Sequence, residues 1–269
     1  MMRYCFVLQR FFALLLLTTP VLAQDVVLPN AFAHNDYQHK KPLFEAIKQG
    51  YANIEADVYA YKGSLVVTHV LPILHHRRTL EALYLEPLAD LINERNGEVY
   101  TGFAAPVTLM IDIKSDGAKT YRLLKPILEK YRSYLCGYSN GQWQPGPVRI
   151  VLSGKKPFDM VRNDPDRLVF IDEDLRKIGR DTTRNLFNMA SCKFSKLVRC
   201  NKDGSLSPRY QARLRNYVND AHKYGVRVRL WASPNKYTTW QQLLTCGVDM
   251  IATDKLTTLH NFLIDEKRR

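Results

Sequence analysis

Two carboxylates stand two residues apart inside an apolar run. Glu55 and Asp57 alternate with Ile54, Ala56 and Val58, and residues i and i+2 of a β-strand point to the same face. Two like charges on one face of a buried strand are costly unless a cation compensates them. Mg²⁺ or Ca²⁺ suits oxygen ligands, so we predict that Glu55 and Asp57 bind one such ion. The alternative is a pair of exposed acids on an edge strand.

A second apolar run ends in an acid and a base. Asp112 and Lys114 follow Leu109 to Ile111 and again share a strand face. An Asp-x-Lys pair alone is typical of an ordinary salt bridge. Because this pair comes one strand after the first, we predict that Asp112 is a third metal ligand. Lys114 is then placed to hold a phosphate oxygen as a point charge.

Two histidines flank the acidic residues in the sequence. His34 ends the run Ala31 to Ala33, and His69 ends the run Leu65 to Thr68. Such a pair is suited to general acid–base catalysis, in which one imidazole takes a proton from the attacking hydroxyl and the other protonates the leaving oxygen. The remaining histidines are interpreted as surface or structural residues: His39, His75, His76, His222 and His260.

The elements that must position these residues alternate along the chain. Strands are expected at Ala31–Ala33, Asn53–Tyr59, Val107–Ile113, Val148–Leu152, Leu168–Ile171, Lys196–Val198, Val226–Trp231 and Met250–Ala252. Helices are expected at Pro42–Gln49, Leu80–Asn93, Thr120–Tyr134, Phe158–Arg162, Thr182–Asn188, Pro208–Tyr224, Thr239–Leu244 and Leu256–Leu263.

Eight alternating pairs predict an α/β fold, a single (β/α)8 TIM barrel with parallel strands. The alternative is an open doubly wound sheet. Polar residues at the ends of several strands favour the barrel. The absence of a glycine-rich nucleotide loop after the first expected strand argues against the open sheet.

The N-terminus has the features of a secretory signal. Arg3 and Arg10 precede an apolar run that ends at Val21-Leu22-Ala23. We therefore expect a signal peptide at 1–23, one barrel domain at 24–269, and export to the periplasm or the extracellular space. An uncleaved N-terminal anchor is the alternative.

The formal net charge of +13 favours contact with anionic surfaces. We expect transient binding to an anionic membrane, no nucleic-acid partner and a monomer. Four cysteines follow the expected signal, without zinc-ligand spacing. Export permits disulfides, and Cys192 and Cys200 are close enough in sequence to bridge a loop.

The pattern from His34 to His69 resembles the N-terminal signature of glycerophosphodiester phosphodiesterases and phospholipase-C-like enzymes. That signature has a histidine after the first strand, a helix ending in glycine, here Gly50, then a strand with Glu-x-Asp and a strand ending in histidine. The run Gly247 to Asp254 also resembles the end of such chains.

Several positions depart from this pattern. Asn35 and Asp36 stand where the family has Arg-Gly, so the phosphate-contacting arginine is absent. The family's Glu-x-Lys is here Asp112 and Lys114, which looks more like sphingomyelinase-D-type phospholipases. The sequence therefore resembles a divergent branch of the superfamily.

The resemblance implies one Mg²⁺ or Ca²⁺ held by Glu55, Asp57 and Asp112, with His34 and His69 as base and acid. Substrate would contact Lys114, Asn35, Ser153 and Trp231; for Ser153 and Trp231, packing at the barrel mouth is an equal alternative.

The expected activity is metal-dependent hydrolysis of a lipid or small-molecule phosphodiester. Two alternatives are weighed against it. One is a barrel glycosidase that uses Glu55 or one of Asp172, Glu173 and Asp174. The other is a non-catalytic barrel that binds anionic lipid or glycan.

Overall fold

Eight parallel strands close into a barrel in the computed structural model, which describes residues 26–72, 78–180 and 185–268. Each strand pairs with the next along the chain, and the first pairs with both the last and the second, which closes the ring. The strands are β1 (Leu28–Ala33), β2 (Tyr51–Tyr61), β4 (Val107–Ile113), β7 (Val148–Gly154), β8 (Val169–Asp174), β9 (Phe187–Lys193), β10 (Arg227–Trp231) and β11 (Met250–Thr253). The TIM barrel expected from the sequence is confirmed.

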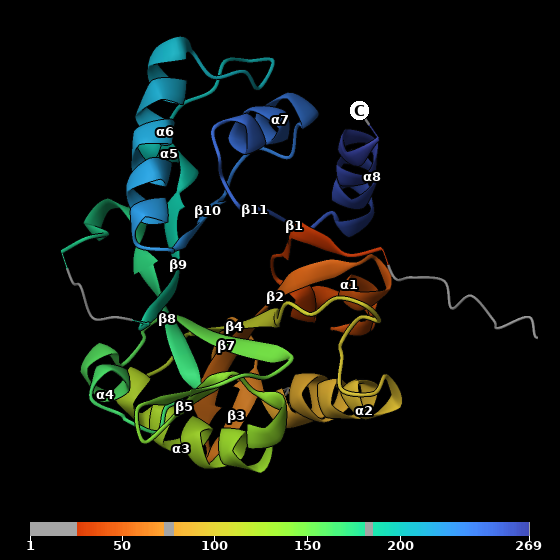
Figure 1. Ribbon diagram of the computed structural model, residues 1–269, viewed down its shortest axis with the longest axis vertical. Coiled ribbons are helices and arrows are strands. Elements are labelled where there is room, and N and C mark those ends of the chain that lie inside the picture. The colour runs from red at the N-terminus through yellow and green to blue at the C-terminus, as the bar shows by residue number, and fades with distance from the viewer. Residues whose placement is uncertain (1–25, 73–77, 181–184, 269) are drawn as a thin grey trace, which may run out of the picture.

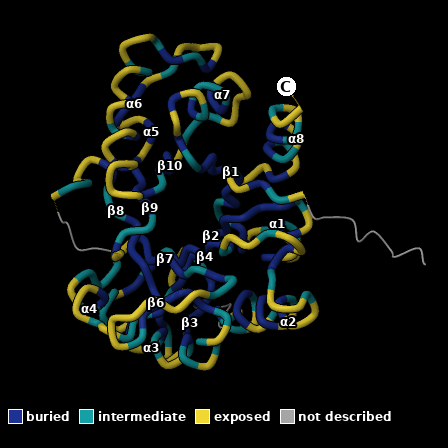
Figure 2. The backbone as a smooth tube through the Cα atoms, in the orientation of Figure 1, coloured by how far each residue is buried: buried dark blue, intermediate teal, exposed yellow. Residues whose placement is uncertain are grey.

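Helices surround the strands (Figure 1). They are α1 (Phe44–Lys48), α2 (Glu86–Glu94), α3 (Gly117–Lys130), α4 (Phe158–Arg162), α5 (Phe194–Leu197), α6 (Pro208–Lys223), α7 (Tyr237–Thr245) and α8 (Leu256–Lys267). Short turns of helix occur at η1 (Asp36–Gln38), η2 (Glu81–Leu85), η3 (Arg132–Tyr134) and η4 (Leu175–Lys177). Burial concentrates on the strands and on the inner faces of the helices (Figure 2). Within the described residues, no helix has the length and apolarity needed to cross a membrane.

Two additions modify the barrel. Strand β3 (Ser64–Val67) runs antiparallel to the end of β2 and leads the chain back over the barrel mouth to His69. A hairpin of β5 (Gly137–Ser139) and β6 (Gln142–Gln144) precedes β7. Its Tyr138 and Trp143 rings pack against Phe170, with centroids 6.4 and 6.1 Å away, and so help to close the N-terminal end of the barrel.

The barrel interior has an apolar layer below a polar one. Inward side chains from six of the strands form a separate buried cluster with Cys136 and Tyr138, which precede β7. Its strand members are Phe32, Met110, Val151, Phe170, Met189, Met250 and Ala252. The larger core lies between the strands and the surrounding helices. Because the apolar layer fills the bottom of the barrel, polar side chains nearer the strand ends lie directly above packed apolar side chains.

The sequence prediction was wrong around the sixth strand. The strand is β9 (Phe187–Lys193), whereas the expected strand Lys196–Val198 begins in the single turn of α5 and then leaves it. The expected helix Thr182–Asn188 lies partly outside the described residues, and its last two residues belong to β9. The run from Met189 to Cys192 contains no β-branched residue, so it carries a weak strand signal. Pairing with β8 and β10 on both sides overrides that signal.

Candidate active site

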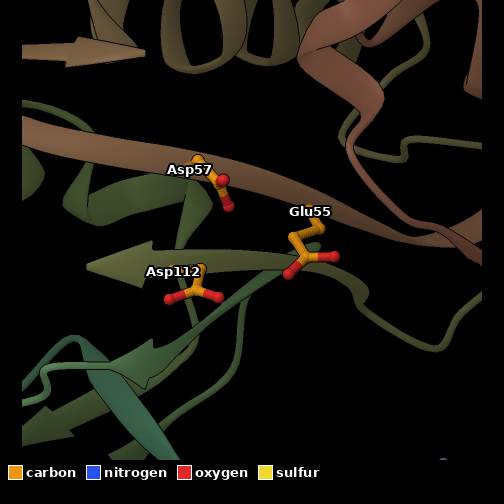
Figure 3. A group of neighbouring side chains, drawn as sticks. All are labelled: Glu55, Asp57 and Asp112. Carbon is orange, nitrogen blue, oxygen red and sulfur yellow. The ribbon is translucent and has the colours of Figure 1, made fainter. Parts of the chain in front are cut away.

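The three predicted metal ligands meet at the C-terminal end of the barrel. Asp57 on β2 lies in register with Asp112 on β4, which lies in register with Ser153 on β7. Glu55 is two residues before Asp57 and therefore faces the same interior, one layer deeper. Figure 3 shows the three carboxylates, two from β2 and one from the neighbouring strand, directed into one region.

This group has the donor set of a hard-cation site. One oxygen from each of Glu55, Asp57 and Asp112 lies within 4.8 Å of the others. The buried Oδ1 atoms of Asp57 and Asp112 have no hydrogen-bond partner among the described residues. A buried carboxylate oxygen without a donor is costly. A divalent ion bound by oxygen ligands would remove that cost, so the residues fit a metal.

Glu55 is buried, with 3% of its surface exposed. Burial raises its pKa, while the positive charges of Arg229 and protonated His34 oppose that rise. The Arg229 Nη1 atom lies 3.5 Å from Glu55 Oε2, and the His34 Nε2 atom lies 3.8 Å from the same oxygen. Arg229 is therefore the buried counter-ion of Glu55, at the long end of the hydrogen-bond range.

The second oxygen of Asp57 collects three donors. Tyr37 donates its hydroxyl to Asp57 Oδ2 at 2.9 Å, the His69 Nδ1 atom lies 2.5 Å from it, and the Lys114 ammonium lies 3.3 Å away. Asp57 thus has one oxygen saturated by protein groups and one without a described donor. The carboxylate links the candidate metal site to His69 and Lys114.

Lys114 bridges the two aspartates. It donates to Asp112 Oδ2 at 3.0 Å as well as approaching Asp57. Burial alone would lower its pKa, but the two carboxylates outweigh burial and raise it. The amine therefore stays charged at neutral pH. A fixed positive charge beside a metal site suits the non-bridging oxygen of a phosphate.

The two histidines follow one pattern. The His34 Nδ1 atom lies 2.7 Å from Asp254 Oδ1, at the end of β11, just as the His69 Nδ1 atom contacts Asp57. A ring that donates Nδ1–H to a carboxylate has Nε2 as its acceptor when neutral and as its acid when protonated. Burial alone would lower the pKa of His34, but the hydrogen bond to Asp254 and the charge of Glu55 raise it.

Asn35 helps to hold the residues around His34 in place. Its backbone has φ 50°, a left-handed conformation that asparagine tolerates better than most residues. Its Nδ2 lies 3.3 Å from Asp254 Oδ1, and its Oδ1 accepts from the Tyr37 hydroxyl at 3.1 Å. The side chain is therefore engaged with residues that hold His34 and Asp57, and this occupies the position where the resembled family has arginine.

Ser153 and Trp231 lie at different levels of the mouth. Ser153 is nearly buried and donates to Asp172 Oδ2 at 3.2 Å. Trp231 is 39% exposed at the end of β10, and the Lys193 ammonium lies 5.5 Å from its ring centroid. Ser153 thus forms part of the polar layer, whereas Trp231 lines the opening.

One cavity of about 520 Å³ brings all nine sequence-derived site residues together: His34, Asn35, Glu55, Asp57, His69, Asp112, Lys114, Ser153 and Trp231. They come from β2, β4, β7 and β10 and from the segments that follow β1, β3 and β4. Convergence of residues from several strand ends is the usual arrangement of an active site on this fold.

Sequence reasoning missed the counter-ion of the barrel interior. Arg229 is 3% exposed, donates to Ser191 at 3.1 Å and approaches both Glu55 and Asp172. Its guanidinium lies 4.4 Å from the Phe32 ring centroid. The inward position of Arg229 could have been predicted in part, because Arg229 shares its strand face with Trp231 at i+2. An arginine inside an apolar strand indicates buried acids nearby.

The acids proposed for a glycosidase are engaged elsewhere. Asp172 is buried under Ser153 and Arg229, Glu173 accepts from the backbone N–H of Asp174, and Asp174 forms a double contact with Arg176. Burial raises the pKa of Asp172, and Arg229 opposes that rise. The two histidines and Lys114 lie instead beside Glu55, Asp57 and Asp112. The geometry therefore favours phosphate chemistry over glycoside hydrolysis.

The four described cysteines are all free. Cys192 is buried in β9 and Cys200 follows α5. The disulfide between them that the sequence permits is not formed.

A parallel barrel with three carboxylates, two histidines and a lysine at its strand ends has the architecture of a barrel phosphodiesterase. Comparison with known proteins is more specific. A model of the AIM6-like phosphodiesterase domain matches residues 21–172, a stretch that holds the three candidate metal ligands and both histidines. The chain belongs to this family, which confirms the phosphodiesterase resemblance.

Relatives extend the similarity beyond that domain. The chain is 30% identical over 277 residues to "Altered inheritance of mitochondria protein 6" of Eremothecium gossypii, covering 90% of this chain and 71% of the relative. It is 30% identical to the protein of that name from Lachancea thermotolerans, covering 86% and 64%. A homologue from Arthroderma benhamiae is 27% identical, covering 82% and 80%.

These relatives contradict the predicted periplasmic or extracellular location. They are yeast and other fungal proteins named for the inheritance of mitochondria. An acid-free N-terminus with arginines and an apolar run occurs in more than one kind of targeting segment, so that pattern does not fix a compartment. The expected signal peptide at 1–23 lies outside the described residues.

Proposed function

We propose that this phosphodiesterase is a metal-dependent hydrolase of phospholipids or of their glycerophosphodiester headgroups. The main support for the proposal is that the two carboxylate oxygens of Asp57, and likewise those of Asp112, have different surroundings. Asp57 and Asp112 each give one oxygen to cationic or hydrogen-bonding side chains and keep one buried oxygen without a described donor. That arrangement fits an ion and a phosphate side by side.

Each site residue would serve a particular step of phosphodiester cleavage. A divalent cation held by Glu55, Asp57 and Asp112 would supply positive charge to a non-bridging phosphate oxygen. Lys114 would hold a second non-bridging oxygen and neutralise the charge that accumulates there. These fixed charges lie over a dry apolar layer, where electrostatic interactions are stronger than in water.

Proton transfer falls to the two Nε2 atoms. His34 Nε2 would take the proton of the attacking hydroxyl while Asp254 stabilises the imidazolium through Nδ1. His69, hydrogen-bonded to Asp57 through Nδ1, would return a proton to the leaving oxygen. The nucleophile is either water or a substrate hydroxyl beside the phosphate, and the second route would release a cyclic phosphate first.

Membrane presentation of the substrate is supported by the surface beside His69. Val70 and Leu71 follow it with 66% and 49% of their surface exposed. Apolar side chains at the edge of a positively charged protein favour contact with an anionic lipid surface. We propose that a lipid diester is taken from such a surface transiently, by a monomer.

A panel of phosphodiesters tests the proposal. The protein is incubated with intact phospholipids and with deacylated glycerophosphodiesters, each with Mg²⁺, with Ca²⁺ and with chelator, and products are followed by phosphorus NMR. Hydrolysis that requires one of the two ions supports the proposal, and a cyclic phosphate signal identifies the nucleophile. Full activity in excess chelator would refute it.

A further inference from the structure

A second set of charges lines the same cavity, on the side away from β2. Three lysines define it, and we call them the lysine wall: Lys156 after β7, Lys193 at the end of β9 and Lys196 in α5. Strand β9 is four strands from β2 in an eight-stranded ring, so Lys193 stands opposite Asp57. Lys193 and Lys196 are three residues apart around one helical turn, which brings them to one side.

The lysine wall is not balanced by ion pairs. Within the described ranges, none of the three lysines pairs with a carboxylate, whereas the neighbouring Arg176 is held by Asp174 at 2.5 Å. Lys193 and Lys196 are exposed and Lys156 is half-buried. Asp172 and Glu173 line the same cavity but form no described ion pair with the three lysines, so a bound anion would still offset the repulsion between the lysines.

The cavity is too large for a phosphodiester group alone. At about 520 Å³ it falls within the range of pockets that enclose whole small molecules. One end holds the candidate metal site and Lys114. The lysine wall shares the other side with Asp172, Glu173 and the Asp174–Arg176 ion pair. Between the scissile phosphate and that wall, the exposed Trp231 ring offers a flat face beside Lys193.

We infer that the lysine wall is a second anion subsite, and that the preferred substrate is a phosphodiester whose alcohol headgroup carries an additional phosphomonoester. This inference rests on the proposed function, because it extends the same cavity. The scissile diester lies between the metal site and Lys114, the headgroup covers Trp231, and the extra phosphate reaches Lys193, Lys196 and Lys156. A phosphomonoester carries nearly two negative charges at neutral pH and binds ammonium groups strongly.

A matched pair of substrates tests the subsite. Glycerophosphoinositol and its 4-phosphate differ by one phosphomonoester, and kcat/KM is measured for each with the full-length protein and the activating ion. The wild type should prefer the phosphorylated diester. The double variant K193M/K196M should lose roughly 10- to 100-fold of that preference, the scale of one or two charge-assisted hydrogen bonds. Lys48→Met, an exposed lysine on α1 without a described ion pair, should keep the wild-type ratio.

A binding arm separates this inference from the proposed function. Inositol 4-phosphate is titrated by calorimetry into the wild type, K193M/K196M, Lys156→Met and Lys48→Met, without turnover. Weaker binding in the three wall substitutions, but not in Lys48→Met, supports the subsite even if no diester is cleaved. Cleavage of both diesters at equal kcat/KM, or equal binding by wild type and wall variants, overturns the subsite and leaves the phosphodiesterase proposal standing.

Discussion

The acidic and basic sides of the cavity are built differently. Glu55, Asp57 and Asp112 lie on β2 and β4, inside the barrel, with their positions set by strand register. The lysine wall combines Lys156 after β7, Lys193 at the last residue of β9 and Lys196 in α5, and the side chains of Lys193 and Lys196 are exposed. The carboxylates that would meet an ion at short distances are fixed by strand register, whereas the charges of the proposed anion subsite lie exposed or half-buried at the cavity opening. The contrast teaches that one cavity can separate chemistry from recognition.

Removal of the ion should produce the largest effect. Chelation should reduce hydrolysis to background, because the acidic side would then present uncompensated carboxylates to an anionic substrate. Asp112→Asn should weaken ion binding by more than the roughly 10–100-fold cost of losing an indirect partner of a ligand. Ion titration by calorimetry measures this. Unchanged ion affinity in Asp112→Asn would remove that residue from the site.

The histidines come next. Replacing either His34 or His69 with asparagine should lower turnover roughly 10²–10⁴-fold, the scale of general acid–base catalysis. The double variant should lose far less than the product of the two effects, because either loss already stalls the reaction. A nitrophenyl diester needs little protonation of its leaving group, so it should rescue only the variant that lacks the acid. We expect rescue of His69→Asn. Near-native turnover on a poor leaving group would make that histidine structural.

Gly154 gives a sharper test of the acidic side. It has φ +67°, and a Cβ there would lie 2.0 Å from Asp112 Oδ1, so Gly154→Ala should displace the carboxylate and weaken ion binding roughly tenfold or more. Gly63 has φ +81° with open space around it. Gly63→Ala therefore carries the same backbone strain without the collision and should keep the ion affinity. Equal ion affinities in the two variants would contradict the role of Gly154.

Arg229 tests the boundary between the two sides. Replacing it with methionine should lower the free energy of unfolding by roughly 3 kcal/mol, because Glu55 and Asp172 would lose their shared buried counter-charge. Denaturant unfolding measures the loss. Arg229→Lys, which keeps a charge, should lose less. A methionine variant as stable as the wild type would show that the two acids are already neutral in the folded protein.

The smallest effect should come from a pair outside the cavity. Burial alone would raise the pKa of Asp164, but hydrogen bonds from Lys125 at 2.6 Å and Tyr121 at 2.9 Å lower it. A folded-state pKa below the unfolded value gives stability that is present above roughly pH 4 and is lost as pH falls through the folded value. Asp164→Asn should therefore lower Tm slightly at neutral pH and match the wild type in strong acid. A difference that persists in acid would point to packing.

Local pattern was enough to find the acidic side. The i, i+2 spacing in β2 and β4 specifies which side chains share a face, and register then brings Asp57 beside Asp112. No such rule locates Asp254, because its contact with His34 joins the last barrel strand to the first, 220 residues apart. That contact depends on barrel closure, which is a property of the whole sheet.

The lysine wall escaped prediction for a different reason. Lys193 and Lys196 stand in the region where the sixth strand was misplaced, so the sequence assigned them no position at the mouth. Met189 and Ala190 have no strong preference for a β-strand. They form one because they pair with the neighbouring strands. A weak strand signal thus hid the residues that follow the strand, even though lysines are visible to any reader of the sequence.

The ring closure at His34 has a consequence for the timing of synthesis. The metal ligands are complete once the ribosome has released β4, but His34 gains Asp254 only when β11 docks between β10 and β1. A partly synthesised chain therefore contains all three candidate metal ligands before it contains the partner that orients His34. A chain stalled or cut before β11 would retain the three candidate metal ligands but lack Asp254, so we expect it to have no phosphodiesterase activity.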